Sequence, residues 1–220
     1  MRFQFRHGFY YVYAVLSVVY ILILRLLPES FQYPALTYIL FTDVCALGFT
    51  FIGALVILEK GQNITESLFV TPIRLSEYLL AKQISFLTLT LLSTEVIMLG
   101  AGIWGERTGW FFIGILLSAP IYTFLGLVFA AKARHVNDYF VKTLGIGLLI
   151  STPILAYAQL FDTPLFYLLP TRATLILLDV MRQNPSAEEI IYALASLVVW
   201  LIITWRWAWM RFEKHVRHPA

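Results

Sequence analysis

Long apolar runs separated by short charged segments dominate the chain. Six stretches have the ~20 mostly apolar residues that a helix needs to cross a bilayer. They cover, to within a few residues, positions 9–27, 34–58, 83–103, 110–131, 139–160 and 190–210. The pattern therefore predicts an all-α polytopic membrane protein with six transmembrane helices, in which residues 1–220 form a single transmembrane domain.

The composition favours the same class and excludes others. Apolar residues make up 60% and charged residues 13% of the 220 positions, against roughly 45–50% and 25% in soluble domains. A soluble domain of this size could not bury so much apolar surface, so a soluble enzyme, a coiled coil and a disordered chain are excluded. The single cysteine, Cys45, excludes a disulfide framework and a cysteine-based zinc site, and we expect no metal site.

Lysine and arginine residues indicate the orientation, because they are concentrated in cytoplasmic loops. With the N-terminus in the cytoplasm, six spans return the C-terminus there, and 12 of the 16 basic residues lie inside. The four outside are Arg25, Arg107, Arg172 and Arg182. The basic excess follows from this rule and does not indicate nucleic acid, because the chain has no basic stripe interleaved with exposed aromatic residues.

Segment 59–82 is the longest inner loop and has a structure of its own. A charged helix end, Glu59-Lys60, is followed by a glycine, and Thr71-Pro72 then fits an N-cap with proline at the first helical position. Apolar residues after it share one face, which predicts a short amphipathic coupling helix on the inner membrane surface. Two interpretations remain open: an interfacial anchor, or a docking element for a cytoplasmic partner.

The outer segment 161–189 contains three prolines between apolar pieces that are each too short to cross a membrane. Such pieces suit re-entrant or interfacial helices. We expect an outer re-entrant hairpin of two half-helices, broken at the second proline, that caps a cavity from outside. A loop that lies on the lipid is the alternative. In the first case Phe166, Leu169 and Ile176 would form an outer gate.

The inner segment carries a spaced set of residues that is more specific than any one of them alone: Glu59, Lys60, Gly61, Glu66, Leu68, Val70, Thr71, Pro72, Glu77, Tyr78 and Lys82. With six spans and the outer segment, this set resembles the permease subunit of ABC-2-type ABC exporters. In that family a Glu-Lys-Gly run after the second span leads through Thr-Pro to a coupling helix. The opening residues 2–11 resemble bacterial permeases grouped with fluoroquinolone or multidrug export.

The resemblance implies a permease half in the bacterial inner membrane, with both termini cytoplasmic, that exports a drug-like or lipid-like small molecule. Its partners would be a second permease half, in a homo- or heterodimer, and cytoplasmic ABC ATPase subunits. ATP and magnesium would bind those subunits, because this chain has no G-x-x-x-x-G-K-[ST] loop. We expect no catalytic residue and no cofactor here. Coupling to the ATPase would involve Glu59, Glu66, Arg74, Leu75, Tyr78 and Lys82.

Two acids lie deep in predicted spans. Asp43 is about 13 Å from the start of the second span and Glu95 about 18 Å from the start of the third, near the middle of a ~30 Å core. An ionised group there costs several kcal/mol unless it is paired or hydrated. The acids Asp43 and Glu95 either line a cavity that meets cationic or zwitterionic substrates or are neutral and bonded to a neighbouring helix. A proton- or cation-coupled transporter or channel using both acids is the alternative function.

Overall fold

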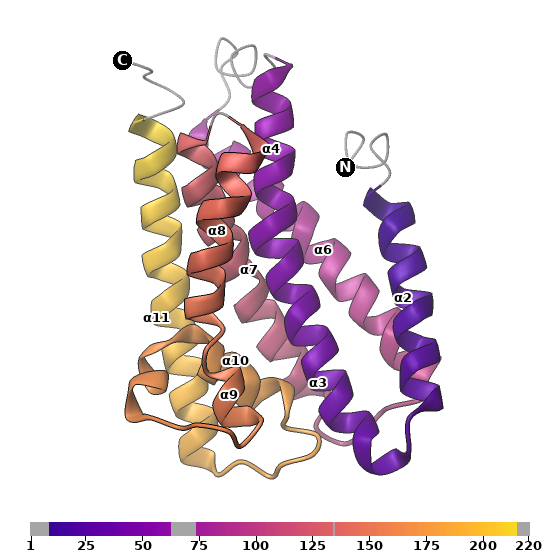
Figure 1. Cartoon of the computed structure of the whole chain (residues 1–220). Coiled ribbons are helices and arrows are strands. Elements are labelled where there is room, and N and C mark those ends of the chain that lie inside the picture. Colours follow the sequence, from indigo (N-terminus) through magenta and orange to yellow (C-terminus); the bar gives the residue numbers. More distant parts are fainter. Residues whose placement is uncertain (1–8, 63–73, 134, 215–220) are drawn as a thin grey trace.

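The chain folds as a bundle of helices (Figure 1). The computed structural model describes residues 9–62, 74–133 and 135–214, and these residues contain no strand. The all-α prediction is therefore confirmed over this part of the chain. The elements are α2 (Phe9–Leu26), α3 (Glu29–Cys45), η1 (Ala46–Phe51), α4 (Ile52–Gly61), α6 (Leu75–Ala101), α7 (Thr108–Lys132), α8 (Val136–Ile150), α9 (Ile154–Tyr157), η2 (Pro164–Leu168), α10 (Pro170–Leu178) and α11 (Ala187–Phe212).

Four helical stretches are long and apolar enough to cross a membrane: Glu29–Gly61, Leu75–Ala101, Thr108–Lys132 and Ala187–Phe212. Their lengths of 25 to 33 residues correspond to roughly 37–50 Å of helix, more than the ~30 Å hydrocarbon core. The first predicted span is a shorter apolar helix, Tyr11–Leu26, and the fifth is α8, with 15 residues. Among the described residues, four of the six predicted spans thus have full membrane length.

Residues 139–160 do not form the single helix that their hydropathy predicts. α8 ends at Ile150, and the chain turns through residues 151–153 into the short α9. Pro153 causes this break, because it has no N–H to continue the hydrogen-bond series. Ile154 then donates to the carbonyl of Ser151. The Ile150 carbonyl accepts instead from a side chain of α10.

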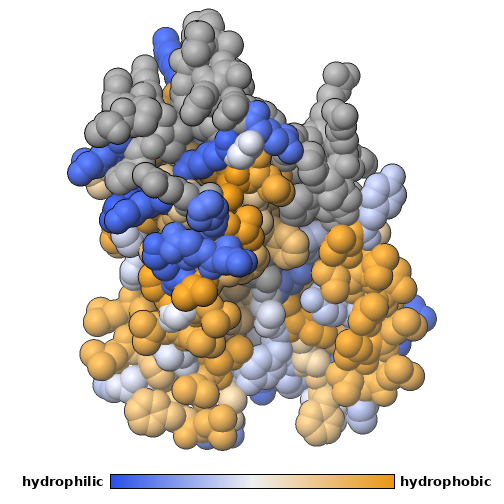
Figure 2. Space-filling view, turned by 45° about the horizontal axis from the view of Figure 1, so that its top comes forward, coloured by the Kyte–Doolittle hydropathy of each residue, from blue (hydrophilic) through white to orange (hydrophobic). Residues whose placement is uncertain are grey.

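The bundle has two chemically different ends. The start of α2 and the end of α11 lie at one end of the bundle, together with the last turns of α4 and α7 (Figure 1). We call it the terminal end. The helices α9 and α10 lie at the opposite end, which we call the hairpin end. Figure 2, turned so that the terminal end comes forward, shows hydrophilic side chains gathered toward that end above largely hydrophobic flanks. This distribution suits a bundle whose flanks contact lipid.

α7 lies in the middle of the bundle and packs against α4, α6, α10, α11 and η1. Its buried side chains belong to two apolar cores. The core toward the hairpin end includes Phe111 and Leu177, and the core toward the terminal end includes Leu79 and Phe212. The π-helical turn η1 lies where the two cores meet, because Phe49 of the turn belongs to the first core and Ile52, the first residue of α4, to the second.

Candidate functional site

A single π-helical turn, η1, interrupts the long helix between α3 and α4. Such turns insert an extra residue, disturb the regular backbone hydrogen bonds and are frequent at functional sites. Tyr139, at the start of α8, donates its hydroxyl hydrogen to the carbonyl of Phe49 in this turn. The Gly126 carbonyl of α7 lies 3.5 Å from the same hydroxyl. The irregular turn is thus held by two neighbouring helices.

A cavity of about 420 Å³ opens beside this turn. Drug-sized ligands occupy pockets of roughly 300–1,000 Å³, so the space suits one small aromatic molecule. The lining combines aromatic rings and hydroxyl groups, and no charged side chain is among the described residues that form it. The lining comes from α3 and η1 (Thr42, Cys45, Phe49, Thr50), from α7 (Tyr122) and from α8 and the residue after it (Phe140, Thr143, Leu144, Gly147, Leu148, Ile150, Ser151).

Gly53, on α4, is required by the position of Tyr139. A methyl group at Gly53 would overlap the tyrosine ring, whereas one at Gly145 of α8 would meet no atom within 4 Å. We expect Gly53→Ala to displace Tyr139 from η1 and to lower the free energy of unfolding by about 1–3 kcal/mol, the usual cost of overpacking. Gly145→Ala should keep the thermal unfolding temperature of the detergent-purified chain or raise it slightly. Equal losses in both variants would contradict this packing argument.

Glu59, at the end of α4, is buried, with 4% of its surface exposed. It accepts a hydrogen bond of 3.0 Å from the Tyr78 hydroxyl and forms an ion pair with Lys82. Both partners reach the same carboxylate because they lie one turn apart on α6. The Tyr78 ring also packs against Phe212 at the end of α11, with ring centroids 5.8 Å apart. Three helices therefore meet at this carboxylate.

The neighbouring Lys60 binds the end of a fourth helix. Its ammonium donates to the carbonyls of Ala130 and Ala131 at 2.9 and 2.6 Å. These carbonyls belong to the last turn of α7, where they have no partner within the helix and form the negative end of its dipole. α4 is thus bound to both α6 and α7. The terminal-end cluster consists of Glu59, Lys60, Tyr78 and Lys82.

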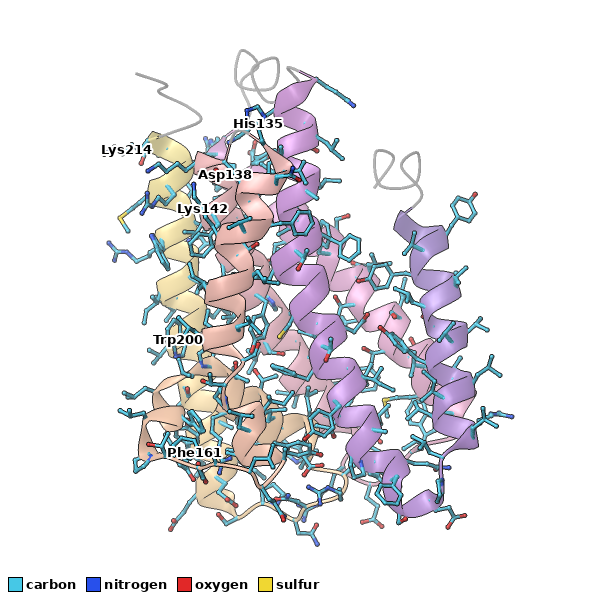
Figure 3. The ribbon with its side chains drawn as sticks, viewed as in Figure 1. His135, Asp138, Lys142, Phe161, Trp200 and Lys214 are labelled. Carbon is cyan, nitrogen blue, oxygen red and sulfur yellow. The ribbon has the colours of Figure 1, made fainter. Side chains whose placement is uncertain are left out.

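Other charged residues share this end of the bundle. His135, Asp138 and Lys142 lie there around the start of α8, and Lys214 lies there at the end of α11 (Figure 3). Lys142 and Asp138 form an exposed ion pair of 2.7 Å. Phe161 lies at the hairpin end (Figure 3). The terminal end is the one that the sequence predicts to face the cytoplasm.

The coupling segment differs in form from its prediction. Leu75–Ala101 is one continuous helix, so residues 75–82 of the predicted interfacial helix form the first turns of α6. Leu75 and Tyr78 are 1% and 6% exposed and face the interior of this chain, so neither side chain is free to seat in a partner's groove. Arg74 is exposed, and Glu66 lies outside the described residues. The segment's part in coupling stays a prediction.

Asp43 and Glu95 are not brought together. Asp43 is 2% exposed, and its Oδ2 atom has no hydrogen-bond partner in the described part of the chain. Its neighbour Thr42 lines the cavity, but Asp43 itself does not. Glu95 is exposed on the flank of α6. It lies ~9 Å from the hairpin end of that helix, because α6 ends at Ala101. The described residues contain no group of acids, histidines or cysteines that could hold a metal ion. A role of either acid in a substrate pathway stays a prediction.

Segment 161–189, the hairpin segment, contains the 3₁₀ turn η2 and the helix α10. Its re-entrant course in the membrane stays a prediction. Phe166 is buried, and Leu169 and Ile176 are half-buried. The segment is bonded to the bundle, because Trp200 of α11 donates its indole hydrogen to the carbonyl of Leu168 at 3.0 Å. Whether these apolar side chains gate an exit stays a prediction.

Asp179, which follows α10, was not among the residues that the sequence predicted for a site. Its buried carboxylate accepts hydrogen bonds from the Arg182 guanidinium at 2.6 and 3.0 Å and from the Tyr157 hydroxyl at 2.9 Å. The bonds to Asp179 raise the pKa of Arg182 above its ordinary value. The Asp-x-x-Arg spacing was the available signal, since it allows such a pair within one turn.

Comparison with known proteins identifies the family. The model of the fluoroquinolones export permease protein family matches residues 1–219. Two proteins of Mycobacterium tuberculosis, from strains CDC 1551 and H37Rv, are named as fluoroquinolones export permease proteins. Each is 26% identical to this chain over 184 residues, which cover 83% of this chain and 78% of the relative. The helices of membrane-crossing length agree with a membrane permease. The chain therefore belongs to the fluoroquinolones export permease protein family.

Proposed function

We propose that this chain is the transmembrane permease subunit of an ATP-driven ABC exporter that moves a small, drug-like molecule out of the cell. The cavity beside η1 carries the proposal, because it is a drug-sized space between η1, α7 and α8 of a chain that belongs to a drug-export family. A planar aromatic drug such as a fluoroquinolone would stack on the rings of Phe49 and Phe140. The surrounding hydroxyl groups would orient it.

The energy source lies on other chains in this proposal. The sequence has no phosphate-binding loop, so cytoplasmic ABC ATPase subunits bind ATP and magnesium. A second permease half, identical or different, completes the pathway. The chain lies in the bacterial inner membrane with its terminal end in the cytoplasm, and Phe166, Leu169 and Ile176 form a gate at the outer end.

Motion of the ATPase reaches the bundle through segment 59–82 in this proposal. Glu59, at one end of the segment, binds Tyr78 and Lys82 at the other. A push on the residues between them is therefore passed to α4 and α6 together. Lys60 passes the motion on to α7 through its bonds to the end of that helix. The exposed Arg74, with Glu66, remains as a contact for the ATPase.

Purification from the native membrane tests this function. An ABC ATPase should copurify with the chain, and the reconstituted complex should export norfloxacin only when ATP is present. Replacing the phosphate-binding lysine of that ATPase should stop export, because the lysine holds the phosphates of ATP. Norfloxacin transport by the chain alone, driven by a proton gradient, would contradict the proposal.

A second candidate function rests on Asp43, whose buried Oδ2 atom has no partner in the described residues. A proton- or cation-coupled transporter would use such an intramembrane acid, with Glu95 as a further site. Asp43→Asn should abolish gradient-driven transport in that case. It should leave ATP-driven export largely intact if the exporter proposal holds, because Asp43 does not line the cavity. Norfloxacin uptake into inverted vesicles, energised in turn by ATP and by a proton gradient, separates the two functions.

A further inference from the structure

One hydroxyl group joins three elements on the hairpin side of the cavity. The Oγ1 atom of Thr171, in α10, lies 2.6 Å from the carbonyl oxygen of Ile150 and 3.1 Å from the hydroxyl of Tyr122. A carbonyl only accepts hydrogen bonds, so Thr171 donates to Ile150 and accepts the hydrogen of Tyr122. Thr171 and Tyr122 are buried, with 0% and 2% of their surfaces exposed. Water therefore does not replace these bonds in the closed bundle.

Two of the three residues line the cavity. Tyr122 comes from α7 and Ile150 is the last residue of α8, whereas Thr171 belongs to the hairpin. α10 is packed tightly on α7, because a methyl group at Gly114 would lie only 2.7 Å from the Cβ atom of Leu177. The hairpin, α7 and the end of α8 thus meet at the Thr171 hydroxyl, and any opening of the cavity between them must break its bonds.

We propose that Thr171, Tyr122 and Ile150 form a latch that closes the cavity toward the hairpin end, and that a ligand with an acceptor oxygen releases it. The Tyr122 hydroxyl has one hydrogen, which it gives to Thr171 in this structure. A carbonyl or carboxylate oxygen of a bound molecule competes for that hydrogen, and Thr171 then loses its bond to α7. The inference rests on the proposed function and deepens it. It makes the hairpin side the exit and names aromatic molecules with an acceptor oxygen as the substrate class.

The chain carries its own reporter, because Cys45 is its single cysteine and lines the cavity. A membrane-impermeant maleimide added on the hairpin side of membranes that hold the whole exporter should label Cys45 slowly. Thr171→Val keeps the shape of the side chain and removes its hydroxyl. Because that hydroxyl makes two hydrogen bonds, its loss should raise the labelling rate up to about 25-fold, about fivefold for each bond.

Three further variants separate the latch from a general loss of structure. Tyr122→Phe removes one of the two bonds and should raise labelling about fivefold. Thr171→Ser should label like the wild type, because it keeps the hydroxyl. Thr123→Val should have no effect, since the buried Thr123 hydroxyl bonds Ala119 within its own helix. Wild-type labelling rates in both Thr171→Val and Tyr122→Phe would overturn the latch, and so would fast labelling in Thr123→Val. If Thr171→Val does not assemble, Thr171→Ala decides, because it also lacks the hydroxyl, whereas Tyr122 is itself bonded to the Cys45 thiol.

The direction and the ligand are tested separately. Faster labelling that occurs only from the terminal side would overturn the assignment of the exit. The labelling assay needs no ATP and no transport, so it gives its result even if the exporter function is wrong. For the ligand, the wild-type exporter should prefer norfloxacin over its decarboxylated analogue, which lacks one acceptor group, and Tyr122→Phe should lose this preference. An unchanged preference in Tyr122→Phe would overturn the role of the acceptor oxygen.

Discussion

Glu59→Ala should lower the free energy of unfolding by about 3–5 kcal/mol, the usual cost of removing one partner of a buried ion pair. The ammonium of Lys82, whose side chain is 14% exposed, would remain beside Tyr78 without a carboxylate to neutralise it. Such a loss is a large part of the ~5–15 kcal/mol that stabilises a typical folded protein. It should be measured as a fall in the thermal unfolding temperature of the detergent-purified complex, with a loss of export.

Two controls identify the buried charge as the cause. The double variant Glu59→Gln/Lys82→Met removes both charges and should recover most of the lost stability. Asp138→Ala breaks the exposed pair with Lys142 and should cost less than about 1 kcal/mol. A double variant as unstable as Glu59→Ala would refute the explanation. If the exporter with the folded double variant hydrolyses ATP without exporting drug, the terminal-end cluster transmits the coupling motion in addition to stabilising the fold.

For the coupling segment, the sequence predicted the helix but not the contacts of its apolar face. The spacing of Leu75, Tyr78 and Leu79 correctly predicted a helix with one apolar face. Periodicity could not tell whether that face meets lipid, a partner or the chain's own core, because all three produce the same stripe. The deciding contacts are those with Glu59 and Phe212, which are distant in sequence. Glu59 and Lys82 both belong to the motif in the sequence, but the sequence alone does not show that they form an ion pair.

The cavity was harder to predict than the helices. A π turn leaves the hydropathy of its helix unchanged, so residues 34–58 read as one ordinary span. The turn depends on the hydroxyl of Tyr139, 90 positions from Phe49, and on the space that Gly53 leaves for its ring. Pro153, in contrast, was a readable signal that α8 ends early. Charged residues are rare in membrane spans, so Asp43 and Glu95 were predicted as site residues. The cavity is instead lined by uncharged side chains, which are common in spans and therefore do not indicate a site.

Gly147→Leu should stop export and leave the fold intact, because it fills the cavity from the side of α8. Gly147 lines the cavity, and a Cβ atom there would lie 3.4 Å from the ring of Phe49, an ordinary contact. The first carbon of a new side chain therefore fits, and the others extend into the space that the drug would occupy. Because each 1.4 kcal/mol of lost binding costs tenfold in affinity, we expect norfloxacin export to fall by at least about tenfold.

Gly145→Leu is the matched control, two positions away on the same helix. Gly145 is exposed, and a Cβ atom there meets nothing within 4 Å, so the same increase in size points away from the cavity. Both variants replace a helical glycine, so both should keep or raise the thermal unfolding temperature. Export at the wild-type rate by Gly147→Leu would mean that the cavity is not on the substrate path. Loss of export in both variants would assign the effect to α8 as a whole and not to the cavity. A loss confined to Gly147→Leu would place the substrate in the cavity, because the two variants differ only in the side of the helix on which the new side chain lies.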